Sequence, residues 1–273
     1  MESCTFQIQR DPTMESSKVS VIIPVFNGEK YLAETIQSAL NSIHRPLEII
    51  IVNDGSTDSS EQIAESFRQK HPSILQVINQ ANAGVSAALN TGGRFASGDY
   101  FFPLGADDLI SQDYLSQASA VLDARPEVKV VYCEAEKFGE FGRKPWKLKP
   151  FSISLLARDN MIFACSLVRR VDWERVGGFS EDMIMGREDW EFWIKILKDG
   201  GEVVKLPILG FHYRIHSGSK RKKTGTTQKK RERIAYLNAK HPEFFERELN
   251  GPLRFQRTWS KPYNTLLKLL GKL

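Results

Sequence analysis

Short apolar runs recur along the first hundred residues of the chain. Val19–Val25 (VSVIIPV) and Leu47–Val52 (LEIIIV) are continuous and rich in β-branched residues, which is typical of strands buried on both faces. Ile74–Ile78 and Tyr100–Leu104 are further apolar runs. The pattern therefore predicts four strands in this part of the chain, of which the first two are buried on both faces.

Segments with a helical period separate these runs. Apolar residues recur at helical spacing from 31 to 43, and a helix rich in small residues is expected from 84 to 96. Asp58 and Glu61 have capping-box spacing, so another helix is expected from 58 to about 70. Strands that alternate with helices of this length predict an α/β fold with a mostly parallel central sheet flanked by helices.

The pattern is less regular in the second half. We expect a helix over 111–124, a strand over 128–133, and a mobile loop rich in Gly, Pro and basic residues over 138–151. A helix from Glu188 to about 198 and strands near Val203 and Phe211 follow. From Ser217 the chain becomes basic and loses apolar periodicity, before a short helical stretch.

Composition adds a weak preference for anionic partners. The chain has 273 residues, a net charge of +5 and a pI near 9.0, which favours nucleotides, nucleic acid or an acidic membrane surface. Cys4, Cys133 and Cys165 lack the spacing of metal ligands and predict thiols in a reducing compartment. Residues 1–18 lack the apolar core of a signal peptide, so a cytoplasmic protein is expected.

Polar residues follow three of the predicted strands. Asn27, Asp54 and the pair Asp107-Asp108 stand at the carboxyl ends, where parallel sheets bind their ligands. Adjacent carboxylates repel each other and favour Mg²⁺ or Mn²⁺, which leave positions open for phosphate oxygens. The alternative for Asp107-Asp108 is the N-cap of a helix.

Two further polar clusters are candidates for chemistry. Glu188 or Asp189 could serve as a general base, and the alternative is negative charge at a helix N-terminus. His212, Arg214 and His216 alternate and so share one face, where they could hold a diphosphate or complete a metal shell. A solvated polar face of an edge strand is the alternative.

Aromatic residues follow the second acidic pair. Trp190 and Trp193 could stack on sugar rings, but their spacing of three residues favours a buried helix face. Gly177-Gly178 predicts a tight turn.

Together these segments resemble glycosyltransferase family 2, the inverting transferases with the GT-A (Rossmann-like) fold. The resemblance rests on VSVIIPVFNGEKYL (19–32), EIIIVNDGSTD (48–58), NAGVSAALN (82–90), LGADD (104–108), GGF (177–179), EDWEFW (188–193) and YRIHSGS (213–219). The segments occur in family order and cover residues 18–219. The resemblance implies transfer of a sugar from a nucleoside-diphosphate donor, UDP first, to a glycan or lipid-linked acceptor in cell-surface polysaccharide synthesis.

The resemblance also implies roles for particular residues. Those implied at the nucleotide-sugar are Pro24, Val25, Phe26, Glu29, Asp54, Asn82, Gly84, Asn90 and Asp107. Asp108 and His216 would bind Mn²⁺ or Mg²⁺, which acts as a Lewis acid on the departing diphosphate. Asp189 would be the general base, with Gly178, Glu188 and Trp190 on the acceptor side.

The chain is accordingly divided into three parts. We expect a polar leader over 1–17, a GT-A domain over 18–217 and a basic helical extension over 218–273. Within the domain, 18–108 would form the nucleotide-sugar half and 109–217 the acceptor half.

Three positions depart from the family pattern. Gly105 stands where an Asp is common, Asn53 replaces the first residue of an Asp-Asp pair, and Leu89 replaces an Arg. Gly105 and Leu89 leave open a catalytically weakened nucleotide-sugar-binding protein of the same fold.

The basic run from Lys220 to Arg233 leaves three alternatives open. It lacks the aromatic interleaving of single-strand readers, which disfavours nucleic acid as a partner. With Leu266, Leu269 and Leu270 it suits a peripheral contact with anionic lipid at the inner face of the membrane. A flexible solvated tail is the third alternative.

Overall fold

The computed structural model describes residues 17–45, 47–140, 142–217, 225–256 and 261–273. Its strands are β1 (Val19–Val25), β2 (Leu47–Asp54), β3 (Leu75–Gln80), β4 (Tyr100–Pro103), β5 (Leu109–Ile110), β6 (Val128–Gly139), β7 (Lys144–Trp146), β8 (Leu167–Arg169) and β9 (Glu202–Ile215). Its helices are α1 (Leu32–Leu40), α2 (Ser60–Lys70), α3 (Val85–Phe95), α4 (Tyr114–Ala124), α5 (Ile153–Leu156), α6 (Arg170–Arg175), α7 (Glu188–Leu197), α9 (Thr227–Lys240), α10 (Pro242–Leu249) and α11 (Lys261–Leu269).

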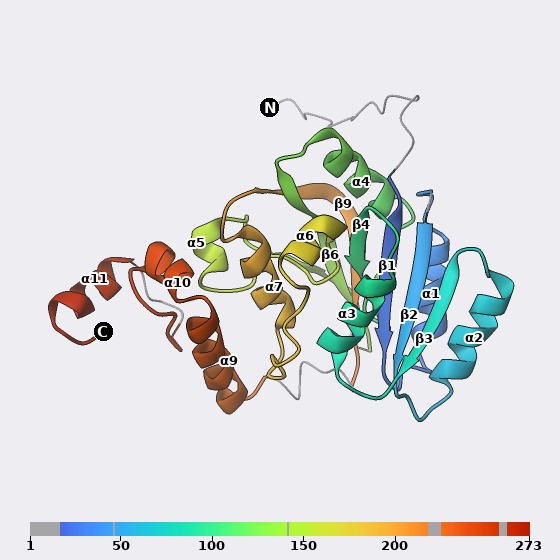
Figure 1. The fold of residues 1–273 in the computed structure, drawn as a ribbon, viewed down its shortest axis with the longest axis horizontal. Helices are drawn as coiled ribbons and strands as arrows, with labels where there is room; N and C mark the ends of the chain where they lie inside the picture. Colours follow the sequence, from blue (N-terminus) through green and yellow to red (C-terminus); the bar gives the residue numbers. More distant parts are fainter. Residues whose placement is uncertain (1–16, 46, 141, 218–224, 257–260) are drawn as a thin grey trace.

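These strands form one mixed sheet in the order β3-β2-β1-β4-β8-β6-β9-β5, with β7 paired to β6 (Figure 1). The half from β3 to β4 is parallel throughout, as the alternation of strands and helices predicts. Antiparallel β8 joins this half to β6, which runs parallel to β9. The sheet therefore brings the ends of β1, β2 and β4 to one edge.

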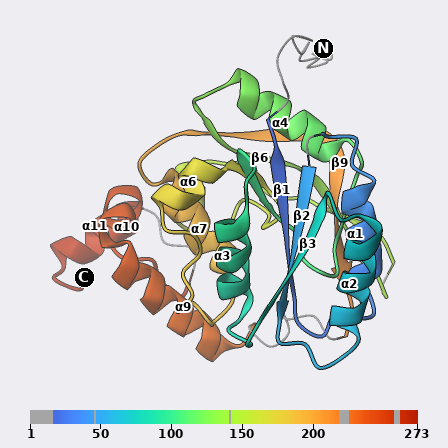
Figure 2. The ribbon, with the colours of Figure 1, turned by 45° about the vertical axis from the view of Figure 1, so that its right-hand side comes forward.

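Helices cover both faces of the parallel half. Figure 2 shows α3 on one side of β1 and β2, and α1 and α2 on the other. Helix α3 lies close to the strands because two glycines face its neighbours. A Cβ at Gly92 would lie 2.3 Å from Ile22, and one at Gly93 would lie 2.4 Å from Trp173. Small residues in this helix are thus a condition of the packing.

Several local predictions were wrong. The expected loop over 138–151 is partly a hairpin, because β6 continues to Gly139 and β7 pairs with it. Trp146 anchors the hairpin by packing on Phe163 and Tyr213. The two strands expected near Val203 and Phe211 form the single strand β9, with register shifts against β6.

The capping box expected at the start of α2 does not form. The helix begins at Ser60, and Asp58 accepts hydrogen bonds from the Ser60 backbone N–H and from the Glu29 backbone N–H. Glu61 instead accepts from the Asn79 side chain. The carboxylates therefore tie α2 to neighbouring loops and to β3.

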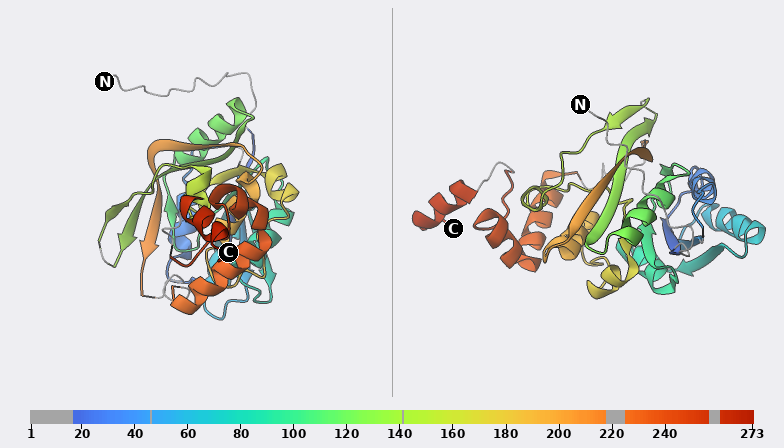
Figure 3. Two further views of the ribbon diagram at one scale, coloured as in Figure 1. Left: turned by 90° about the vertical axis from the view of Figure 1, so that its left-hand side faces the viewer. Right: turned by 90° about the horizontal axis from the view of Figure 1, so that it is seen from above.

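The basic extension is structured from residue 225 to residue 256. Helices α9 and α10 pack beside α7, at the opposite end of the molecule from α2 (Figure 3). Leu237, Phe244, Phe245 and Leu249 are buried in the same apolar cluster as Trp193. The flexible-tail alternative is wrong for this part, while 218–224 lie outside the described residues.

Cysteines take no part in cross-links in the described chain. Cys133 and Cys165 are buried free thiols, as predicted. Cys4 lies outside the described residues.

Candidate functional site

The carboxyl end of β1 exposes an aromatic ring. Pro24 is half-buried and Val25 is buried, whereas Phe26 is 54% exposed. Glu29 follows in the same loop, and its carboxylate accepts a hydrogen bond from the Ser59 backbone N–H at 3.0 Å. This loop and the start of α2 therefore form one fixed platform beside Phe26.

Asp54, the last residue of β2, organises the loop before α3. Its Oδ1 accepts from the Gln80 side chain and from the Ala83 N–H, both at 2.8 Å. Its Oδ2 accepts from the Gly84 N–H at 2.8 Å, and Asn82 donates to the Asp54 carbonyl at 2.9 Å. Since a carboxylate offers about four acceptor positions, one remains on Oδ2.

The two carboxylates after β4 have different partners. Asp107 Oδ2 lies 2.9 Å from His216 Nε2, just beyond the end of β9. Asp108 Oδ1 accepts from the Arg214 backbone N–H at 2.8 Å and is 5% exposed. The structure thus joins Asp107, Asp108 and His216 in one cluster, in which Asp107 is the more accessible carboxylate.

Burial and the neighbouring Asp107 charge raise the pKa of Asp108 well above its usual range. Arg214 opposes this effect, and its guanidinium donates to the Asp107 carbonyl and to Glu34. The ring of Tyr31 lies 4.5 Å from the same guanidinium. Arg214 therefore connects the acidic cluster to Glu34 and Tyr31.

The face of β9 is only partly as predicted. His212 pairs with Glu136 of β6 at 2.7 Å, so it belongs to the sheet and not to this cluster. The edge-strand alternative is wrong, because β9 lies between β6 and β5. Arg214 and His216 are the members of this face that meet Asp107.

Asp189 lies in the first turn of α7. Its Oδ2 accepts from the Asn160 side chain at 2.6 Å, and its Oδ1 accepts from the Trp190 N–H at 3.0 Å. Burial and the adjacent Glu188 charge raise the pKa of Asp189 to about 6. A carboxylate with this pKa is suited to take up a proton near neutral pH.

The turn before Asp189 has an unusual backbone. Gly186 and Arg187 have φ angles of 77° and 63°, in the left-handed region. Buried Arg233 of α9 donates to the Gly186 carbonyl at 2.8 Å and to the Met185 carbonyl at 2.6 Å. The basic extension therefore fixes the turn that positions Asp189.

The Asn90 side chain forms hydrogen bonds with the Gly-Gly-Phe turn. Its side chain accepts from the Phe179 N–H and donates to the Phe179 carbonyl, both at 2.8 Å, and to Glu181 at 2.9 Å. Gly178 has a φ of 66°, and a Cβ there would lie 2.3 Å from Asn90 Oδ1. Asn90 thus shapes the turn at Gly178 and Phe179, and its side chain is buried.

One short segment connects the two acidic positions. Asn160 donates a hydrogen bond to the Asp189 carboxylate. Five residues later, the Cys165 thiol contacts the Gly105 backbone, and burial and the Asp108 charge raise the pKa of this thiol. Five residues of extended chain span at most about 18 Å. The Asp189 carboxylate and the Gly105 backbone therefore contact the two ends of one short segment.

A comparison with family models decides the identity. The model described as Glycosyl transferase family 2 matches residues 20–191. The chain belongs to this family. An uncharacterized glycosyltransferase of Rickettsia typhi is 32% identical over 194 residues, which cover 67% of the chain and 59% of that relative. The chain thus spans less than two thirds of that relative's length.

Solved structures support the family 2 fold. S. aureus TarS 1-349 in complex with UDP-GlcNAc matches with a TM-score of 0.68 at 19% identity, covering 92% of this chain and 76% of the TarS 1-349 chain. Mannosyltransferase PcManGT from Pyrobaculum calidifontis, in complex with GDP-Man and Mn²⁺, matches with a TM-score of 0.68 at 20% identity, covering 94% and 75%. The GT-A prediction is therefore confirmed.

The positions that depart from the family 2 pattern have local explanations. A Cβ at Gly105 would lie 2.9 Å from Asp108 Oδ2 and 3.2 Å from Asp107 Oδ1. Both carboxylates therefore lie close to the space that a side chain at this position would occupy. Leu89 is 5% exposed and packs in the core. Asn53 is buried and donates to Asn79 of β3 at 3.0 Å.

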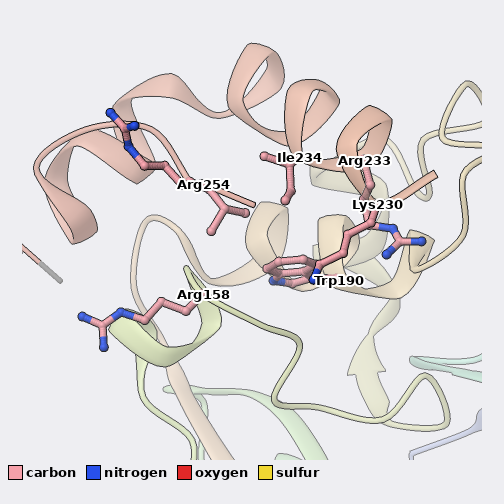
Figure 4. Close-up of a pocket in the computed structure, with 7 residues that line it drawn as sticks. Arg158, Trp190, Lys230, Arg233, Ile234 and Arg254 are labelled. Carbon is pink, nitrogen blue, oxygen red and sulfur yellow. The ribbon is translucent and has the colours of Figure 1, made fainter. Parts of the chain in front are cut away.

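Trp190 is a buried residue of α7 in this family 2 chain. It is 1% exposed, and its indole N–H donates to the Leu156 carbonyl at 2.7 Å. It lines a small pocket beneath α9, where the charged ends of Arg158 and Arg254 point away from it (Figure 4). The core interpretation of Trp190 holds, and Glu188 is the half-buried neighbour.

Sequence reasoning missed Asn160 and Arg233. Both act on the turn and helix of Asp189 from segments that carry no family motif. The charge run around Arg233 gave no sign that one of its residues is buried.

Proposed function

We propose that this chain is an inverting glycosyltransferase. It would transfer a sugar from a nucleoside-diphosphate donor, a UDP-sugar first, to a hydroxyl of a glycan or lipid-linked acceptor. The observation that carries the proposal is the Asp107–His216 pair at the carboxyl edge of the sheet. The raised pKa of the Asp189 carboxyl supports it. Family membership supports the assignment.

The nucleotide would lie along the ends of β1 and β2. Phe26 offers an exposed ring for stacking, and Asp54 Oδ2 keeps an acceptor position for an imino proton of the base. Pro24 and Glu29 would contribute to the walls of this site. The nucleotide site would be supported indirectly by Asn82, Gly84 and Asn90, because their hydrogen bonds fix the loops around it.

The residues of the cluster fit Mn²⁺ or Mg²⁺. The described residues contain no group of three or more His, Cys, Asp or Glu that could hold an ion alone. Asp107 and His216 would supply an oxygen and a nitrogen ligand, and the donor diphosphate would supply others. Asp108 has one oxygen committed to Arg214, so we assign it to supporting Asp107. A bound ion would neutralise charge on the departing diphosphate.

Asp189 would accept the proton of the acceptor hydroxyl. Asn160 fixes the orientation of its carboxylate, and attack from the face opposite the leaving group inverts the anomeric carbon. Gly178 and Glu188 would border the acceptor.

Calorimetry tests the donor site. We expect UDP and UDP-GlcNAc to bind the full chain in the presence of Mn²⁺, with GDP and GDP-mannose as competitors for the assignment of the base. Because the ion takes ligands from the diphosphate, Mn²⁺ alone should bind at least about tenfold more weakly than with nucleotide. Asp107→Asn should abolish the metal-dependent binding, whereas Asp199→Asn, at an exposed turn, should not change it.

A donor-hydrolysis assay separates the enzyme from a binding module. Slow release of sugar that requires Asp189 would support the transferase. Donor binding without any turnover would support the weakened binding protein instead, and no nucleotide binding would refute both.

A further inference from the structure

Charge is divided unequally along the chain. Residues 218–273 contain fifteen Lys and Arg against four Asp and Glu, whereas residues 1–217 contain twenty-three against twenty-nine. The first part is therefore acidic, and the extension alone makes the protein basic. A segment of this charge is attracted to anionic surfaces.

Helix α11 ends this basic segment with an exposed apolar face. Leu266, Leu269 and Leu270 are 51%, 80% and 56% exposed. The opposite side of the helix is anchored, because Leu267 is buried and Asn264 donates to the Leu249 carbonyl at 2.7 Å. The leucines are thus held outward by the packing of the same helix.

The lysines of α11 lie away from this face. At about 100° per residue, the three leucines fall within about 100° of arc, and Lys261 and Lys268 lie about 140° and about 160° from Leu266. Lys268 pairs with Glu246 of α10. An apolar face with cations on the other side is the pattern of helices that lie in a membrane interface.

We propose that α11 docks the protein on an anionic lipid surface. The leucines would enter the interface, and the cations of the extension would face acidic headgroups. A second copy is a poorer occupant, because pairing two such faces would bring two basic extensions together. Nucleic acid offers no apolar surface for the leucines.

The position of α11 suits this role. It lies at the far end of the molecule from β3 and α2, and the views of Figures 1 and 3 agree on this. No helix in the described part of the chain is long and apolar enough to cross a bilayer. Attachment would therefore be peripheral. This proposed attachment does not depend on the proposed glycosyl transfer.

Vesicle cosedimentation of the full chain tests the proposal. We expect binding to vesicles of phosphatidylcholine with phosphatidylglycerol, and weak or no binding to phosphatidylcholine alone. The double variant Leu266→Ser/Leu270→Ser should lower the partition coefficient by about tenfold per leucine. The control Ile43→Ser/Val171→Ser removes equally exposed apolar residues, 62% and 60%, from other surfaces. It should bind as the parent protein does.

Three results would overturn the inference. They are equal binding to both kinds of vesicle, unchanged binding of the leucine variant, and a fall in sedimentation mass of the variant, which would show that the face pairs copies. Thermal unfolding of each variant checks that the fold is intact.

Discussion

Asp189 combines a constrained geometry with a shifted proton affinity. Its pKa near 6 follows from burial and from the adjacent Glu188 charge. A general base works only when deprotonated, so the transfer rate should fall as pH drops through about 6 and level off above it. A pH–rate profile of kcat measures this, and Asp189→Asn should lower kcat by about 10²–10⁴-fold. A profile without an inflection near pH 6 would contradict the assignment.

Gly178 offers a second test at a single residue. Its left-handed φ and the 2.3 Å approach to Asn90 both exclude a side chain. Gly177 also has a positive φ, but a Cβ there meets nothing within 4 Å. We expect Gly177→Ala to cost about 1–2 kcal/mol of unfolding free energy and Gly178→Ala about 1–3 kcal/mol more. Urea unfolding compares them, and equal losses would refute the role of Asn90.

Roles of single residues were only partly predictable. Asp54, Asp107 and Asp189 stand in motifs whose residue types suit the chemistry. The hydrogen bonds between Asn90 and Phe179 could not be predicted, because the two residues are 89 positions apart in the chain. No local pattern encodes a contact of that kind.

At the scale of elements, α9 acts as a clamp on the turn before α7. Arg233→Lys keeps the charge but loses the planar fork that holds two carbonyls. We expect kcat to fall by about tenfold to a hundredfold, with the donor KM unchanged, because the donor residues lie on other elements. Arg231→Lys, on the exposed side of α9, is the matched control. Equal losses in both variants, or a change confined to KM, would argue against the clamp.

Elements were predictable where their own sequence carried the signal. The buried runs of β1 and β2 were predicted correctly because each is apolar along its length. Helix α1 was predicted because its apolar residues recur at helical spacing. The β6–β7 hairpin was missed, since its stability comes from Trp146 packing on distant rings. A helical stretch was expected only after Arg233, and the first part of α9 was missed because its charged sequence hides the buried Arg233.

At the scale of the whole molecule, the extension and the sheet share one core. His241 lies 2.9 Å from Glu191, and both are buried. We therefore expect a single cooperative unfolding transition of the full chain. His241→Ala should cost about 2–4 kcal/mol, because the buried Glu191 carboxylate loses the hydrogen-bond partner of its Oε1. Circular dichroism and tryptophan fluorescence should give coincident urea curves, and two separated transitions would contradict the shared core.

The contact between His241 and Glu191 also sets an order of events during synthesis. Glu191 leaves the ribosome fifty residues before His241 does. At about 5–20 residues per second this interval is roughly 3–10 s. During it residues 18–108 can already be folded while α7 lacks the segment that buries it. In the nascent protein, α7 would therefore reach its final packing only after residue 241 has been synthesised.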